Sequence, residues 1–153
     1  MSTYLGYSTD LQSIQDILEL KNIDAVDIGC GNGDFAAELV KLGARMTGIE
    51  PDPVQAEKNR NAATVPGLTL LEAGAETLPL AERSQDLVVF RFSLHHIPPS
   101  LYPDVFKEAA RVLRPGALLY VMEPVAEGSS QYVMELFHDE TEVRAAAQEA
   151  LRE

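Results

Sequence analysis

A glycine-rich turn between a short apolar run and a helical pattern constrains this chain more than any other feature. The run Ala25 to Ile28 leads into Gly29, Gly31 and Gly33, and apolar residues at helical spacing follow. Glycine at every second position lets the backbone adopt positive φ angles and lets a ligand approach where a Cβ atom would block it. The next helix directs free N–H groups at the same place. The segment therefore predicts a nucleotide-binding turn.

Strand-like and helix-like segments alternate along most of the chain. Strands are expected over 23–28, 45–50, 68–72, 87–92 and 117–122, and helices over 11–20, 35–42, 53–63 and 101–113. This alternation predicts a mostly parallel sheet with helices on both faces, an α/β Rossmann-like three-layer sandwich. Arg114, Pro115 and Gly116 are expected to end the fourth helix, and 129–153 predicts one helix or two joined near His138.

The composition limits what the chain can bind. With 153 residues, of which 46% are hydrophobic, the chain is long enough for one compact domain with its own core. Twelve Lys and Arg against twenty-four Asp and Glu give a formal net charge of −12, which opposes binding to nucleic acids and to anionic membranes. Nucleic-acid and anionic-membrane partners are therefore disfavoured, whereas an acidic surface suits a cationic ligand. A solvated acidic surface is the simpler reason for the excess of acids.

The single cysteine, Cys30, excludes an intramolecular disulfide and favours a reducing compartment, so the cytoplasm is the expected location. No apolar run approaches the roughly 20 residues that a membrane-spanning helix needs. Cys30 lies inside the glycine turn, where a small residue is required. A small filler residue is therefore favoured over a reactive thiol.

Several motifs in order resemble the class I S-adenosylmethionine-dependent methyltransferases, especially small-molecule enzymes of the ubiquinone/menaquinone-biosynthesis type. They stand at 26–33, 48–52, 75–97 and 112–117, and the resemblance spans 25–123. It implies a single S-adenosylmethionine-binding domain over 1–153. Within it, 1–20 would form an N-terminal helix and lid, 21–123 the cofactor-binding core, and 124–153 a C-terminal helical segment.

The resemblance implies cofactor contacts around the glycine turn. Gly29, Gly31 and Gly33, with Cys30 between them, would pass beneath the methionine part of S-adenosylmethionine. The Asp27 carboxylate, at the end of the strand, would reach the ammonium group directly or through water.

Further contacts are implied after the second and third strands. Glu50 would accept hydrogen bonds from both ribose hydroxyls, and Pro51 would pack against the adenine. Ala75, with Glu76 beside it, would meet the adenine edge. Without a ligand, Glu50 would be a solvated strand end and Glu76 a cap of the following turn.

One position departs from the family. Where this chain has Gly74, the family commonly has an aspartate that accepts a hydrogen bond from the adenine amino group. Glu72, Glu76 or backbone groups are the possible substitutes in this chain.

Two histidines and an arginine follow or end the fourth strand, at the edge where open α/β sheets bind ligands. His95 and His96 are candidate catalytic bases, and the alternative is that they anchor the loop. Arg91 would pair with the cofactor carboxylate or, equally, with a neighbouring acid. No metal is expected, because only His138 remains and no carboxylate cluster has metal-site spacing.

The sequence therefore predicts a methyltransferase that transfers the methyl group of S-adenosylmethionine to a small-molecule acceptor by in-line displacement. A non-catalytic S-adenosylmethionine-binding module, or a partner subunit of degenerate type, is the alternative. A nicotinamide-dependent oxidoreductase is a third reading, and Asp34 weakens it because the dinucleotide motif requires glycine there.

The family usually continues beyond the fifth strand with two further strands, which this sequence does not contain. An uncovered apolar strand edge favours pairing with another chain. We therefore expect either a homodimer through the sheet edge or the C-terminal helix, or a fragment of a longer chain. Tyr4 and Tyr7 are candidates for a lid over the cofactor or for ordinary surface residues.

Overall fold

The computed structural model describes residues 8–125 and 139–152, which form an α/β fold around one sheet. The strands are β1 (Asp24–Ile28), β2 (Arg45–Glu50), β3 (Leu68–Glu72), β4 (Gln85–Arg91) and β5 (Leu113–Met122). The helices are α1 (Asp10–Gln15), α2 (Asp34–Lys41), α3 (Pro53–Asn61), α4 (Tyr102–Val112) and α6 (Thr141–Ala150), with short 3-10 turns η1 (Leu94–His96) and η2 (Pro99–Leu101).

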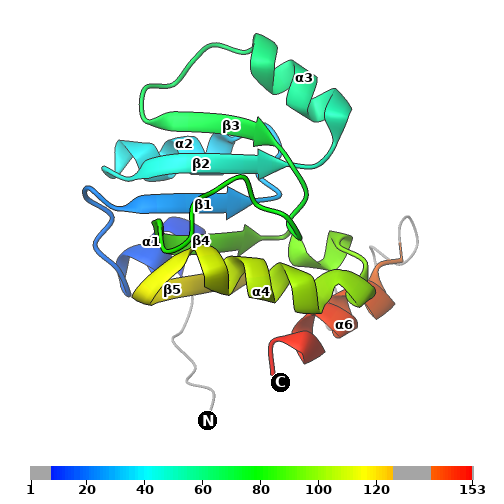
Figure 1. Cartoon of the computed structure of the whole chain (residues 1–153). Coiled ribbons are helices and arrows are strands. Elements are labelled where there is room, and N and C mark those ends of the chain that lie inside the picture. Colours follow the sequence, from blue (N-terminus) through cyan, green and yellow to red (C-terminus); the bar gives the residue numbers. More distant parts are fainter. Residues whose placement is uncertain (1–7, 126–138, 153) are drawn as a thin grey trace.

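The five strands are parallel and lie in the order β3-β2-β1-β4-β5. In Figure 1, α4 crosses in front of the sheet and α2 lies behind it, so the sheet is the middle of three layers. This arrangement confirms the predicted α/β Rossmann-like sandwich. Because the strands are parallel, their carboxyl ends meet at one edge, and the loops of that edge carry the residues discussed below.

Each face of the sheet has its own apolar core. On one face, Val26 and Ile28 of β1 pack with α4 and with Ala147 of α6. On the other face, Ala25 of β1 packs with Leu39 of α2 and with residues of α1. The side-chain alternation of β1 sends successive residues into opposite cores, so this strand is buried on both faces, as expected for a central parallel strand.

Local chemistry explains where the helices begin. The side chain of Asp52 accepts a hydrogen bond from the Val54 backbone N–H at 2.9 Å, and Pro53 occupies the first turn of α3. Gly33 precedes α2 with a φ of 82°, which glycine adopts without steric cost. The glycine turn therefore leads directly into α2.

Two predicted elements differ from the structure by four residues or more at one end. The first helix covers Asp10–Gln15 rather than 11–20; beyond its end Ile17 is 50% exposed, whereas Leu20 returns to the core.

The fifth strand begins at Leu113 rather than at 117, and residues 114–117 bulge opposite Asp86. Arg114 within the bulge pairs with Asp86 at 2.5 Å and with Asp24 at 3.0 Å. The Asp86 carboxylate also accepts a hydrogen bond from the Asp24 backbone N–H at 2.9 Å. Asp86 therefore has a structural role. The ion pairs that hold the bulge join residues that are distant in sequence, so the local apolar pattern could not predict them.

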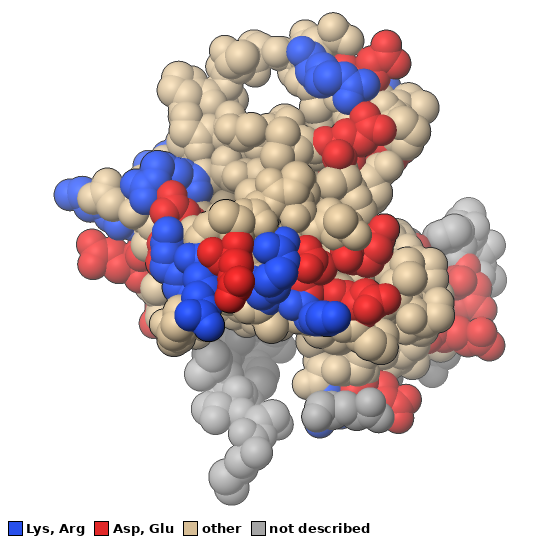
Figure 2. Space-filling view, viewed as in Figure 1, with Lys and Arg blue, Asp and Glu red and all other residues tan. Residues whose placement is uncertain are grey.

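Opposite charges lie side by side over α4 and the beginning of β5 (Figure 2). Glu108 and Arg111 of α4 pair at 2.7 Å. This ion pair and those of Arg114 are partly exposed, so each contributes modestly to stability. Within residues 8–125 and 139–152, no helix is long and apolar enough to cross a membrane. The predicted joint near His138 lies outside the described residues.

Candidate functional site

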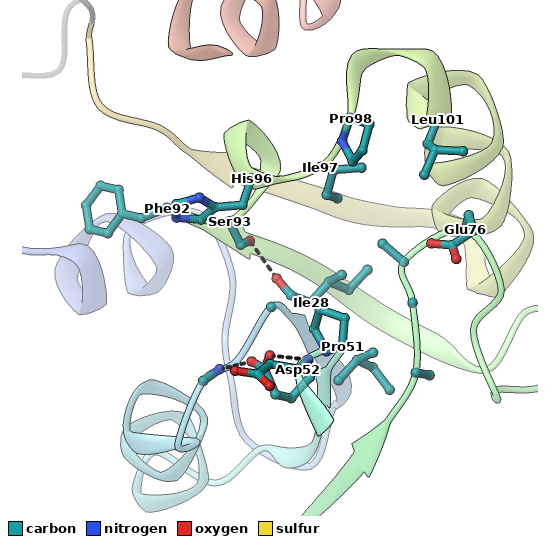
Figure 3. A pocket seen from close by; sticks show the side chains of 17 residues that line it. Ile28, Pro51, Asp52, Glu76, Phe92, Ser93, His96, Ile97, Pro98 and Leu101 are labelled. Carbon is teal, nitrogen blue, oxygen red and sulfur yellow. Dashed lines mark hydrogen bonds between the residues drawn. The ribbon is translucent and has the colours of Figure 1, made fainter. Parts of the chain in front are cut away.

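A cavity of about 650 Å³ opens at the carboxyl edge of the sheet, between the loops that follow β1, β2, β3 and β4 (Figure 3). Open α/β sheets bind ligands at this edge. Seven of the predicted site residues line the cavity: Gly29, Gly31, Glu50, Pro51, Ala75, Glu76 and His96. Five others do not: Asp27, Cys30, Gly33, Arg91 and His95.

The glycine turn requires glycine for two different reasons. A Cβ atom on Gly29 would lie 2.4 Å from the Cβ atom of Ser93, which is too close for any side chain. Ser93 is held there by its hydroxyl, which donates to the Ile28 carbonyl at 2.6 Å (Figure 3). Gly31 has a φ of 57° and nothing within 4 Å of its Cβ position. The turn thus packs tightly at Gly29 and leaves its backbone open at Gly31.

Glu50 ends β2 and points its carboxylate into this space. One carboxylate oxygen accepts from the Gly31 backbone N–H at 2.8 Å, and the other accepts from the Asp52 backbone N–H at 2.9 Å. The dashed lines beside the Asp52 label in Figure 3 mark these bonds. Each oxygen of an ionised carboxylate has a second lone pair, so the group keeps acceptor capacity toward the cavity. The residue is only 8% exposed. This geometry suits a ligand with two adjacent hydroxyl groups.

Glu76 occupies the place that a side chain at position 74 would fill. A Cβ atom on Gly74 would lie 2.4 Å from Oε1 and 2.5 Å from Oε2 of Glu76. Glu72, the other possible substitute, instead pairs with Arg60 at 2.8 Å and does not line the cavity. Of the two glutamates, only Glu76 therefore offers a carboxylate at the site of the missing aspartate.

Asp27 lies beneath the turn rather than in the cavity wall. It is 2% exposed, and burial raises the pKa of its carboxyl to about 7. The positive charge of Arg91 opposes this rise in pKa, and the negative charge of Glu50 adds to it. A cationic group arriving near Asp27 would favour the ionised carboxylate.

Arg91 pairs with a neighbouring acid, which is the second of the two roles predicted for it. Its guanidinium pairs with Asp10 of α1 at 2.5 Å and lies over the rings of Phe35 and Phe92, at 4.8 and 4.9 Å from their centroids. The neighbouring acid is therefore supplied by a helix that lies eighty-one residues earlier in the chain.

Cys30 and Gly33 shape the turn from below. Cys30 is buried against Gly48, where a Cβ atom would lie 2.7 Å from its sulfur. Burial raises the pKa of the Cys30 thiol to about 12, so the side chain is an unreactive filler, as the sequence favoured. Gly33 lies at the start of α2, where a Cβ atom would lie 3.0 Å from the Leu70 side chain.

The two histidines have different surroundings. His95 is 4% exposed, and its Nδ1 makes a hydrogen bond with the buried carboxylate of Glu123, at the end of β5. The other oxygen of Glu123 accepts from the backbone N–H groups of Ser93 and Leu94, at 3.1 and 2.8 Å. His96 is exposed and lines the cavity. His95 therefore anchors the loop through Glu123, and of the two histidines only His96 lines the cavity.

Glu140 also approaches the histidines. Its carboxylate lies 3.9 Å from Nε2 of His95, and the ligand atoms of Glu140, His95 and His96 all lie within 4.8 Å of one another. The sequence predicted no metal, and the fold brings a carboxylate to the two histidines that the spacing of residues in the sequence did not indicate. Glu123 and Glu140 are distant in sequence and reach the pair through β5 and the start of α6.

Sequence reasoning missed several residues of the site. Glu123 had a usable signal, because an acid that ends a parallel strand is the pattern that identified Glu50. Ser93 had none, since a lone serine after a strand is common. The cavity wall also includes apolar residues that were not predicted as site residues, among them Phe92, Ile97, Pro98 and Leu101.

Comparison with known proteins identifies the family of this fold and site. The methyltransferase-domain family matches residues 26–121. This chain belongs to the class I S-adenosylmethionine-dependent methyltransferases.

Individual proteins agree with the match. An uncharacterized methyltransferase of Mycobacteroides abscessus is 34% identical over 113 residues, which are 72% of this chain and 43% of that protein. A demethylmenaquinone methyltransferase of Chlorobaculum tepidum is 33% identical over 101 residues, 65% of this chain and 40% of the relative. A crystal structure of an S-adenosylmethionine-dependent methyltransferase from Methanosarcina mazei is similar with a TM-score of 0.64 and 30% identity, covering 71% of this chain and 55% of the other.

The family fixes the cofactor class. S-adenosylmethionine is the methyl donor of this methyltransferase family, as the name of the similar protein from Methanosarcina mazei indicates. The nicotinamide-dependent alternative is therefore wrong. The chain spans less than half the length of the two curated relatives described above.

Proposed function

We propose that this methyltransferase-family chain binds S-adenosylmethionine in the cavity and transfers its methyl group to a small-molecule acceptor. The observation that supports this most is the Glu50 carboxylate, held between the backbone N–H groups of Gly31 and Asp52 with acceptor capacity left toward the cavity. Together with the open backbone at Gly31, it fits the ribose diol of a nucleoside. The residues present therefore fit the cofactor.

Three acidic residues would hold different parts of the cofactor. Glu50 would accept hydrogen bonds from the ribose hydroxyls. Glu76 would accept from the adenine amino group, replacing the aspartate that the family commonly has at position 74. Asp27 would balance the ammonium charge from beneath the turn, and its raised pKa means that binding would draw a proton away from the carboxyl at neutral pH.

The bound cofactor supplies an electrophilic methyl group on a sulfonium. The task left to the protein is to exclude water and to align the acceptor with that methyl group. The apolar part of the cavity wall suits both tasks: Phe92, Ile97, Pro98 and Leu101. His96, exposed beside them, would accept the proton of an acceptor hydroxyl or amine.

The apolar wall favours an acceptor with an aromatic or otherwise apolar body. The name of the Chlorobaculum tepidum relative, a demethylmenaquinone methyltransferase, points in the same direction. A cytoplasmic location and a homodimer through the sheet edge or the C-terminal helix stay predictions, as does the absence of nucleic-acid and membrane partners.

The test is methyl transfer from S-adenosylmethionine carrying a labelled methyl group. The full chain would be incubated with a panel of phenols, quinols, amines and thiols, and the labelled products would be identified by mass spectrometry. We expect a labelled product with the wild type and at least a tenfold lower rate with Glu50→Gln. Binding of the cofactor without transfer to any acceptor would contradict the proposed catalysis and favour the non-catalytic module.

Glu72→Gln is the matched control. Glu72 lies directly opposite Glu50 in the register of β3 and β2, carries the same side chain, and points away from the cavity to Arg60. A rate equal to that of the wild type is expected for this variant. If both glutamate variants lose activity equally, the effect of Glu50 is on the sheet and not on the site.

A further inference from the structure

We infer that His95, His96 and Glu140 form a binding site for a divalent transition-metal ion, with Zn²⁺ as the best-suited ion. Two imidazoles and one carboxylate are a ligand set that Zn²⁺ takes in proteins. One ligand atom from each residue lies within 4.8 Å of the others. The residues come from η1 and from the position just before α6, two elements that pack against each other.

The surroundings of His95 orient it for this role. The hydrogen bond from Nδ1 to Glu123 leaves Nε2 as the ring atom that faces Glu140. Metal-binding histidines usually donate their second ring N–H to a carboxylate in this way, because that bond fixes the tautomer and the ring orientation. Glu123 is not a member of the ligand set, so it is an independent feature that points to a metal at Nε2.

The distances leave room for an ion. The 3.9 Å from Nε2 of His95 to the Glu140 carboxylate is too long for a hydrogen bond. Two ligand atoms about 2.0–2.1 Å from a tetrahedral Zn²⁺ lie roughly 3.3–3.5 Å apart. The His95–Glu140 pair therefore needs only a small inward movement. His96 is exposed, and its ring centroid lies 4.1 Å from that of His95, so it would move toward the ion from beside its partner ring.

Arg144 sets a limit on the affinity. Its guanidinium contacts the same Glu140 oxygen that faces His95, at 2.6 Å. An ion at the site must share this oxygen with the guanidinium or displace it. We therefore expect weaker binding than at closed structural zinc sites, which have four protein ligands.

Such an ion would lie at the wall of the cofactor cavity. His96 lines that cavity, and three protein ligands leave a position for water or for an oxygen atom of a bound molecule. The ion would also join η1 to the beginning of α6. With an ion bound, His96 would hold the metal and could not also take a proton, so a metal-bound water would be the base in its place. Zinc binding requires no cofactor. Failure of zinc binding would leave His96 as the proposed base, and failure of methyl transfer would leave the zinc site standing.

The experiment is calorimetric titration of Zn²⁺ into the metal-free full chain, repeated with Co²⁺ and followed by visible absorption. We expect one ion per chain and the absorption of tetrahedral Co²⁺. His96→Ala and Glu140→Gln should each weaken binding at least tenfold. Glu123→Gln should weaken it about 10–100-fold, as loss of such supporting carboxylates does.

Glu142→Gln is the matched control, because Glu142 is an exposed acid two positions from Glu140. The affinity of this variant for Zn²⁺ should equal that of the wild type. Circular dichroism of each variant checks that it folds. Because His96 is exposed, its replacement leaves the core intact. No stoichiometric binding by the wild type, or wild-type affinity in both His96→Ala and Glu140→Gln, would overturn the inference.

Discussion

The buried carboxyl of Asp27, beneath the glycine turn, is predicted to lower the free energy of unfolding of the ligand-free protein when it is ionised. Burial raises the pKa of its carboxyl from the ordinary value of 3.8 to about 7. Since one pKa unit corresponds to about 1.4 kcal/mol, ionising this buried group costs the folded state about 4 kcal/mol relative to the unfolded chain. The folded state binds the proton more tightly than the unfolded state. The contribution of Asp27 to the free energy of unfolding is therefore highest below about pH 4 and declines until about pH 7.

Replacing Asp27 by Asn removes the charge while keeping the shape of the side chain. The free energy of unfolding of this variant should exceed that of the wild type by up to about 4 kcal/mol at pH 8. The difference should fall toward zero near pH 4, where the wild-type carboxyl is protonated in both states. Urea unfolding followed by circular dichroism, at half-unit steps from pH 4 to pH 8, measures this difference.

Asp24 on the same strand provides the control of opposite sign. The hydrogen bond from Arg45 lowers the pKa of the Asp24 carboxyl. Its negative charge therefore stabilises the fold above the pKa of the unfolded chain, and that contribution is lost as the pH falls through the lowered pKa. Asp24→Asn should destabilise the protein at pH 7, and less so in acid. A stability difference for Asp27→Asn that does not change with pH would refute the reasoning.

Other predictions concern the adenine end of the cavity, the glycine turn and the thiol. Glu76→Ala should weaken S-adenosylmethionine binding about tenfold, which corresponds to the loss of one hydrogen bond to a charged group. Adding Gly74→Asp to that variant should restore the affinity for S-adenosylmethionine, measured by calorimetry. Retained affinity in Glu76→Ala would contradict this role. Gly29→Ala should lower the free energy of unfolding by about 2 kcal/mol or more in urea titration. The reason is that the new Cβ atom would lie 2.4 Å from the Cβ atom of Ser93, at a position where φ is 77°. An unchanged midpoint of urea unfolding would contradict this prediction. Burial raises the pKa of the Cys30 thiol to about 12. Cys30 should therefore react with a thiol reagent at pH 8 only after the protein unfolds. Rapid labelling of the folded protein would contradict its burial.

The sequence predicted the sheet well because each strand is a local signal. The strands at 45–50 and 68–72 have the expected bounds, since apolar runs between turn residues identify buried parallel strands. Glu50 was placed at the cavity by the family resemblance together with its position at a strand end. These inferences depend on neighbouring residues, on the order of the motifs and on the rule that parallel strands share a carboxyl edge.

Residues that depend on distant partners could not be placed in the same way. Arg91 lies on a predicted strand, but its acid, Asp10, comes from a helix far away in sequence. His95 and His96 are adjacent and chemically identical, yet one binds buried Glu123 and the other faces the cavity. Only tertiary packing distinguishes such pairs.

The central proposal is that the cavity binds S-adenosylmethionine through Glu50. Calorimetric titration of the cofactor into wild type, Glu50→Gln and Glu72→Gln, below the melting temperature of each, tests it most directly. Replacing the Glu50 carboxylate by an amide removes charge-assisted hydrogen bonds worth about 1.5–3 kcal/mol each. We expect one site per chain, at least tenfold weaker binding by Glu50→Gln, and unchanged binding by Glu72→Gln. No binding by the wild type, or equal affinities in all three proteins, would contradict the account.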